Sequence, residues 1–173
     1  MANLSAGIGQ ICVSGCPDDV ISAVGLGSCV AVVLYDGFSD QLGVVHCMLP
    51  ADKGRQADAS DRPGRYVDTG VTELVRRMSV PPQRVSRLVA ALVGGAAMFE
   101  FNGPSELDIG KSNITAARQI LCEFQVQVLA ADTGGNQGRT LKVQCDDGTV
   151  TVRTLGQERT LICLREKAAR RAA

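Results

Sequence analysis

The chain has 173 residues, enough for one ordinary domain with a sizeable hydrophobic core. Lys and Arg together number 18, as do Asp and Glu, and this balance argues against nucleic acid or an acidic membrane surface as the main partner. Aromatic residues make up only 3%, which argues against a base-stacking platform. No apolar run has membrane-spanning length, and Met1–Leu4 has no basic start of a signal peptide, so we expect a cytoplasmic protein.

Short apolar segments between turn residues predict several β-strands in the first fifty residues. The predicted strands span 7–13, 20–24, 29–35 and 42–49. A Gly-rich turn over 25–28 precedes the third of them, and the turn residues 36–41 join the last two into a predicted β-hairpin. The polar segment 51–62 that follows predicts a surface loop, either a lid over a reactive centre or an inert solvated loop.

The rest of the chain alternates between two amphipathic helices and further strands. The first helix is expected to open at Pro63 with Asp61 as its cap and to end before Pro81; the second is expected over 112–124, capped by Ser112. Predicted strands span 85–93, 126–131, 140–145, 149–155 and 160–164. This pattern predicts one α/β or α+β domain over 1–173, with helices covering sheet faces, a core at about 7–164 and a frayed tail at 165–173.

Seven cysteines and a single histidine set the chemistry that this chain can perform. The cysteine count is odd, no Cys-x-x-Cys pair occurs, and one histidine cannot supply the usual zinc ligands, so we expect free thiols and no metal. Cys29 follows the flexible Gly25-x-Gly27 turn, and the histidine is His46 in the second hairpin strand. Imidazole is the usual base for a nucleophilic thiol, so the pair is a candidate catalytic dyad.

Hairpin geometry decides whether these two side chains can meet. A turn centred near Gly37 or Phe38 would place Cys29 and His46 almost opposite each other, with Cβ atoms about 5 Å apart. A slip of one residue in the register would turn one of them to the other face. The structural alternative is that the cysteine only packs and the histidine is a satisfied core residue.

Other motifs of small-molecule enzymes are absent or incomplete in the sequence. The glycine loop Asp132-Thr133-Gly134-Gly135-Asn136-Gln137-Gly138-Arg139 lacks the Gly-Lys-Ser/Thr ending of a P-loop. A strand pattern, not a helix, follows Gly25-x-Gly27, so that turn is no dinucleotide fingerprint, and Gly-x-Ser-x-Gly is absent. The chemistry that remains is centred on cysteine.

Six segments stand out by their order and spacing: Gly25-Leu26-Gly27-Ser28-Cys29-Val30, His46-x-Met48-Leu49-Pro50, Pro63-Gly64-Arg65-Tyr66-x-Asp68, Gly94-Gly95-Ala96-x-Met98-Phe99, Ile109-Gly110 with Asn113, and Asp132-Thr133-Gly134-Gly135-Asn136-x-Gly138-Arg139. Together they resemble the CheD family of chemoreceptor glutamine deamidases, over about residues 7–164. The resemblance implies an α/β fold with a β-sandwich between helical layers, similar to the cysteine-histidine deamidase toxins. It also implies hydrolysis of receptor glutamine side chains to glutamate without metal or organic cofactor.

The resemblance assigns roles to particular residues. Cys29 corresponds to the nucleophile and His46 to the base. Backbone N–H groups near Gly27, Ser28 and Cys29 are candidates for the oxyanion hole, because small residues there let a substrate backbone approach. Family members carry a threonine that orients the histidine, and this chain has Ala23 at that position. A backbone carbonyl or water is the expected substitute, with Ser22 as the second choice. Residues of substrate or structural motifs are Tyr66, Gly94, Gly95, Asp132, Thr133, Gly134, Gly135, Asn136 and Arg139.

The resemblance also implies partners. These are the cytoplasmic helices of methyl-accepting chemotaxis receptors and the phosphatase CheC, with no nucleic acid and no membrane insertion. The missing threonine at Ala23 leaves an alternative, in which the protein is chiefly a regulatory binding module for CheC with weak or no deamidase activity.

Overall fold

The computed structural model of the chain describes residues 1–52, 62–97 and 108–172, and their side chains up to residue 170. In these ranges ten strands form two five-stranded sheets. Sheet A has the order β1-β3-β8-β9-β10, with bounds Asn3–Ser5, Val20–Leu26, Arg139–Gln144, Thr149–Thr154 and Gln157–Cys163. Sheet B has the order β2-β5-β4-β6-β7, with bounds Ile11–Ser14, Gln41–Cys47, Val30–Asp36, Val89–Gly94 and Gln127–Thr133.

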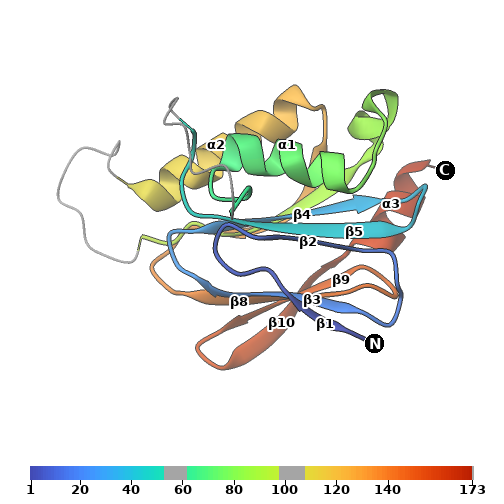
Figure 1. The fold of residues 1–173 in the computed structure, drawn as a ribbon. Helices are drawn as coiled ribbons and strands as arrows, with labels where there is room; N and C mark the ends of the chain where they lie inside the picture. Colours follow the sequence, from blue (N-terminus) through green and yellow to red (C-terminus); the bar gives the residue numbers. More distant parts are fainter. Residues whose placement is uncertain (53–61, 98–107, 173) are drawn as a thin grey trace.

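The two sheets face each other, and two helices lie on the far side of sheet B (Figure 1). These helices are α1, Val67–Arg77, and α2, Ile109–Glu123. The predicted mixed fold with a β-sandwich and two amphipathic helices is confirmed. The helices do not enclose the sandwich from both sides, however, because α1 and α2 share one layer. In the described part of the chain, the outer face of sheet A presents half-buried or exposed side chains such as Ser22 and Lys142.

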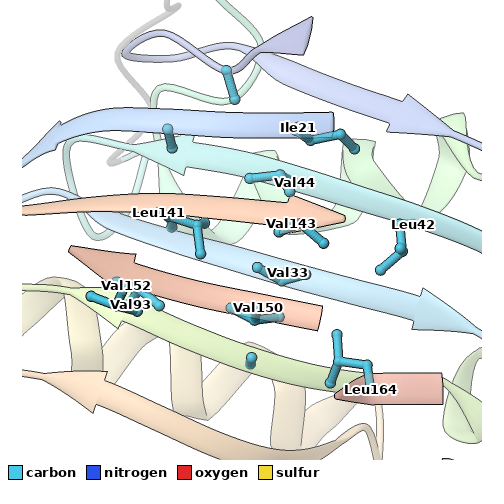
Figure 2. Packing of buried hydrophobic residues seen from close by; sticks show 14 of the residues in the cluster. Ile21, Val33, Leu42, Val44, Val93, Leu141, Val143, Val150, Val152 and Leu164 are labelled. Carbon is cyan, nitrogen blue, oxygen red and sulfur yellow. The ribbon is translucent and has the colours of Figure 1, made fainter. Parts of the chain in front are cut away.

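Two apolar layers hold this arrangement together. The layer between the sheets takes alternate residues from facing strands, such as Ile21 of β3, Val33 of β4 and Leu141 of β8, all 0% exposed (Figure 2). The layer between sheet B and the helices takes the other face of β4 and β5 together with Val71 and Leu74 of α1. Strand β4 serves both layers, and all seven of its residues are buried. Its continuous apolar sequence is what a strand covered on both faces requires.

Several element boundaries differ from those predicted from the sequence. Helix α1 begins at Val67 with Tyr66 as its N-cap residue, rather than at Pro63. The segment before it is tied to the sheet instead, since Gly64 N donates to Gly9 O at 2.9 Å, and a Cβ on Gly64 would lie 2.7 Å from Val45 Cγ2. Asp61, most of the expected 51–62 loop, and Met98 and Phe99 lie outside the described residues.

Three further boundaries were also wrong. Helix α2 begins at Ile109, and its cap is Asp108, whose carboxylate accepts from Lys111 N at 3.0 Å; Ser112 lies inside the helix. A 3-10 helix, η1, occupies Pro82–Arg87, so the strand expected from residue 85 begins at Val89. The expected frayed tail is helical, as α3, Leu164–Ala172. None of the described helices is long and apolar enough to cross a bilayer.

Candidate functional site

The β4–β5 hairpin places Cys29 and His46 on one face. Ala31 pairs directly with His46, and Cys29 precedes β4, two residues before Ala31. Side chains alternate along a strand, so Cys29, Ala31 and His46 all face the layer between the sheets. Cys29 is therefore the diagonal neighbour of His46 rather than its direct partner, which corrects the predicted register by two residues but retains the shared face. Cys29 is 7% exposed and His46 is fully buried.

The two ring nitrogens of His46 have different surroundings. Nδ1 lies 3.0 Å from the carbonyl oxygen of Ala6, in the segment between β1 and β2. A carbonyl can only accept, so this hydrogen bond requires the proton on Nδ1 and leaves a free lone pair on Nε2. Nε2 is buried and has no hydrogen-bond partner among the described residues. The imidazole is thus fixed in orientation and tautomer, with the nitrogen that can take a proton left free.

Burial controls the charge state of both groups. It lowers the pKa of His46 from its ordinary value, and the hydrogen bond with Ala6 opposes this effect only in part. Burial also raises the pKa of the Cys29 thiol. At neutral pH these directions favour a neutral thiol beside a neutral imidazole over a preformed thiolate–imidazolium pair. An imidazole in this state can accept a proton as the sulfur attacks a carbonyl carbon.

The contact with Ala6 O orients the imidazole of His46 in a chain that has Ala23 where a threonine was expected. Ala23 is fully buried on the inner face of β3 and has no polar side chain to offer. Ser22 lies on the opposite face, where its hydroxyl donates to Leu4 O at 3.3 Å, so the structure does not bring it to His46. The pairing of β3 with β8 shifts between Ala23 and Leu26, and this bulge comes after Ser22 and does not turn it inward.

The turn that carries Cys29 is fixed by the end of β6. Gly95 N donates to Cys29 O and Ala96 N donates to Gly27 O, each at 2.7 Å. Gly94 has φ +114°, and a Cβ there would collide with Cys29 O, so only glycine permits this close approach. Gly94 and Gly95 therefore support the turn through their backbone.

The backbone N–H groups around Cys29 differ in whether they already donate a hydrogen bond, and this difference reduces the number of candidates for the oxyanion hole. Gly27 N already donates to Gly25 O at 3.0 Å, so Gly27 shapes the turn rather than offering a free donor. The N–H groups of Ser28 and Cys29 have no carbonyl partner among the described residues. These two adjacent groups are the candidates for stabilising an oxyanion.

Asn113 of α2 is a site residue that our predicted set of site residues lacks. Its side chain is fully buried, and Nδ2 donates to Ser28 O at 2.8 Å and to Met48 O at 3.0 Å. One amide thus joins the turn before Cys29 to the residue two positions after His46. A polar residue on the buried face of a predicted helix was the available signal, but the sequence does not indicate which carbonyls it would reach.

The other predicted motif residues have supporting positions. Thr133 pairs with Gly94, Gly134 N donates to Gly94 O at 3.0 Å, and Ala97 N donates to Gly135 O at 2.8 Å. The glycine loop therefore lies against the end of β6 that holds Cys29, at the left of Figure 1. Tyr66 is buried, forms a β-bridge with Leu49 and is the N-cap residue of α1. Among the described residues, no hydrogen bond joins it to Cys29 or His46.

Asp132 joins the two sheets at this end of the molecule. Its carboxylate accepts from Arg139 Nε of β8 at 3.0 Å and from Arg159 Nη2 of β10 at 2.7 Å. Asp132 itself belongs to β7 of sheet B, so both ion pairs cross from one sheet to the other. Asn136 is exposed in the loop between β7 and β8. Among the described residues, no group of His, Cys, Asp and Glu side chains is arranged to hold a metal ion.

Comparison with known proteins gives consistent matches. Residues 48–154 match the family model CheD, described as CheD chemotactic sensory transduction. The chain is 43% identical over 150 residues to the probable chemoreceptor glutamine deamidase CheD of Methanococcus vannielii, covering 87% of this chain and 94% of that one. It is 39% identical over 150 residues to the chemoreceptor glutamine deamidase CheD of Thermotoga maritima, covering 87% and 90%. A Neisseria meningitidis structure, NMB0706, aligns with a TM-score of only 0.44 at 13% identity, over 77% of this chain and 63% of that one.

Proposed function

This chain belongs to the CheD family, and we propose that it hydrolyses glutamine side chains of chemoreceptors to glutamate, with Cys29 as nucleophile and His46 as base. The observation that carries the proposal is the state of His46. Its Nδ1 is held by Ala6 O at 3.0 Å, while Nε2 is buried on the face that Cys29 shares and has no hydrogen-bond partner in the described part of the chain. A base needs this combination of a fixed tautomer and a free lone pair.

The reaction begins with transfer of the thiol proton of Cys29 to Nε2 of His46 as the sulfur attacks the amide carbon. The carbonyl oxygen takes up the negative charge and accepts from the N–H groups of Ser28 and Cys29. The proton on Nε2 then passes to the leaving nitrogen, the carbon–nitrogen bond breaks, and ammonia departs to leave a thioester. His46 next removes a proton from water, which attacks the thioester, and the sulfur leaves as thiol with that proton. The products are a glutamate side chain and the original enzyme.

Ammonia release from a receptor cytoplasmic fragment tests the proposal, with mass spectrometry locating each converted glutamine. Wild-type protein should release ammonia in proportion to the converted glutamines, whereas Cys29→Ala and His46→Ala should not. Brief iodoacetamide labelling with mass mapping should modify Cys29 faster in wild-type protein than in His46→Ala if His46 activates it. Ammonia release by Cys29→Ala would overturn the mechanism.

The proposed partners are the cytoplasmic helices of chemoreceptors, which would place the protein in the cytoplasm. CheC is a further proposed partner, and a mainly regulatory role toward it is the second candidate function. The alanine at position 23, where a threonine is expected, favours that second role. The hydrogen bond of His46 with Ala6 O opposes it, because the ring is held without a threonine. Measuring ammonia release with and without CheC separates the two.

A further inference from the structure

A polar pocket of about 260 Å³ lies at the same end of the molecule as the Cys29 turn. Its lining includes Asp132, Asn136, Gln137, Arg139, Thr154 and Arg159, and we call it the arginine pocket. The lining comes from three places: the glycine loop, the start of β8 and the hairpin between β9 and β10. The mechanism proposed above leaves this pocket unused.

The charges that line the arginine pocket do not cancel. Asp132 contributes one negative charge, and Arg139 and Arg159 contribute two positive charges, so the lining carries one net positive charge. The Asp132 and Arg139 side chains are 12% and 10% exposed, whereas that of Arg159 is 62% exposed. The ion pair of Asp132 and Arg139 is therefore largely shielded from solvent, and the surplus charge of Arg159 lies on the open side of the pocket.

Arg139 and Arg159 also differ in how many donors they use. Arg139 donates from Nε to Asp132 and from Nη1 to Gln137 O. Arg159 makes one hydrogen bond with the described residues, from Nη2 to Asp132. A guanidinium has five N–H donors in a planar fork, so Arg159 has donors available for a second carboxylate.

The pocket lies within reach of a substrate bound at Cys29. Arg139 pairs with Leu26 across β3 and β8, and Leu26 is three residues before Cys29. Three residues span at most about 11 Å, and paired strands are about 5 Å apart, so the Cα atoms of Arg139 and Cys29 are within roughly 16 Å. An α-helix advances about 5.4 Å per turn. Arg159 donates to the same Asp132 carboxylate as Arg139, so its guanidinium lies beside that of Arg139. Allowing for the lengths of the side chains, a helix whose glutamine reaches Cys29 can therefore bring a residue one or two turns away to Arg159.

We propose that the arginine pocket binds a carboxylate side chain of the substrate helix, one or two turns from the glutamine that is hydrolysed. This proposal rests on the proposed function and adds to it a preference for glutamines that have an acidic neighbour. Arg159 supplies the contact to the substrate carboxylate. Asp132 holds Arg159 in place, and its own charge is balanced by Arg139. With one surplus charge, the pocket favours one acidic side chain and predicts only a moderate dependence of binding on salt.

A set of helical peptides with one target glutamine tests the proposal. Each carries a single Glu three, four, seven or eight residues before or after that glutamine, and its matched control carries Gln there. We expect wild-type protein to act on one Glu peptide about two- to fivefold better in kcat/KM than on its control, the upper part of the range for an exposed ion pair. Arg159→Gln should remove this preference through KM, with kcat unchanged. Arg153→Gln should keep it, because Arg153 is an exposed arginine on the other face of the same sheet.

Binding to the Cys29→Ala protein, measured by fluorescence anisotropy, makes the test independent of turnover. Tighter binding of the Glu peptide that is lost in the double variant with Arg159→Gln supports the pocket, even if the wild-type protein releases no ammonia. Such inactivity would count against the proposed function instead. Equal binding of the Glu peptide and its control at every position overturns the pocket proposal, and so does a preference that survives Arg159→Gln.

Discussion

The two apolar layers of the molecule contain similar residues but differ in what they can do chemically. Neighbouring residues of β5 show the difference, because His46 faces the layer between the sheets and Cys47 faces the helices. Cys29 and Cys47 are both buried, and burial raises the pKa of both thiols. Of these two, Cys29 alone shares a layer with the imidazole, and it lies beside backbone N–H groups that have no carbonyl partner among the described residues. We therefore expect position relative to a base, rather than burial, to separate a reactive cysteine from a packing cysteine.

The largest expected effect comes from exchanging the two cysteines for alanine one at a time. Cys29→Ala should lower deamidation by at least about a thousandfold, because the nucleophile is lost, with little change in Tm. Cys47→Ala should keep the activity and lower the free energy of unfolding by roughly 1–2 kcal/mol, since it leaves a small cavity beneath the helices. Ammonia release and thermal unfolding of both variants measure this. Equal losses of activity would remove the distinction between the layers.

Asn113 connects the two layers, so its replacement should give the next largest effect. In Asn113→Ala the carbonyls of Ser28 and Met48 lose their donor, and the Cys29 turn can shift relative to β5. We expect kcat to fall by about 10- to 100-fold, the effect of a small misplacement of reacting groups. Ser112→Ala, at the neighbouring helix position, is the matched control. A slower reaction of Cys29 with iodoacetamide at unchanged Tm would identify positioning, whereas an unchanged kcat would show that the turn holds without Asn113.

The buried imidazole predicts that the layer between the sheets is sensitive to acid. The pKa of His46 is lowered in the folded state, so between that pKa and the unfolded value of about 6.5 the unfolded chain binds more protons. The free energy of unfolding should therefore decrease as pH falls below about 6.5. Above that pH, the stabilising contribution of the neutral His46 is fully present. Urea unfolding of wild-type protein and of His46→Gln between pH 5 and 8 compares the slopes. A slope that is the same in both proteins would show that other groups cause the acid sensitivity.

The smallest effects are expected at the neighbouring positions 22 and 23. Ala23→Thr adds a hydroxyl on the inner face of β3, but Ala6 O already holds His46, so the rate should change by less than about fivefold, the value of one neutral hydrogen bond. Ser22→Ala should change the rate even less, because its hydroxyl contacts Leu4 O on the outer face. Steady-state rates of both variants provide the comparison. A tenfold or greater gain in Ala23→Thr would mean that the Ala6 carbonyl orients the ring poorly.

Local patterns predicted the hairpin well but not its register or what contacts it. The turn residues 36–41 and the two apolar runs predicted β4 and β5, and their alternation placed Cys29 and His46 on one face. The direct partner of His46 is nonetheless Ala31, because the turn is centred between Phe38 and Ser39. From composition, the centre of a tight turn can be placed only to within a residue or two. Moving that centre by one residue changes the cross-strand partner of each residue by two positions.

Long-range contacts could not be predicted from local patterns. The Ala6 carbonyl that holds His46 belongs to the backbone and leaves no mark on residue type, and β1 beside it is only three residues long. Asn113 reaches Ser28 across 85 residues of chain. The predicted start of α1 was also wrong. Pro63 fits a first helical turn, but a tertiary hydrogen bond to Gly9 O holds Gly64 against the turn before β2 and close to Val45 of β5.

Strand β4 ties Cys29, the proposed nucleophile, to a part of the molecule that we expect to open last. Its seven residues are all buried, and β5 and β6 pair with it on both sides. Amide protons in such a strand exchange with solvent only when the whole domain unfolds. Cys29 is joined directly to this strand, so we expect activity on heating to persist until global unfolding and to disappear with it. If a hydrogen-exchange profile shows β4 as the slowest segment, global unfolding should set the upper limit of the enzyme's working temperature.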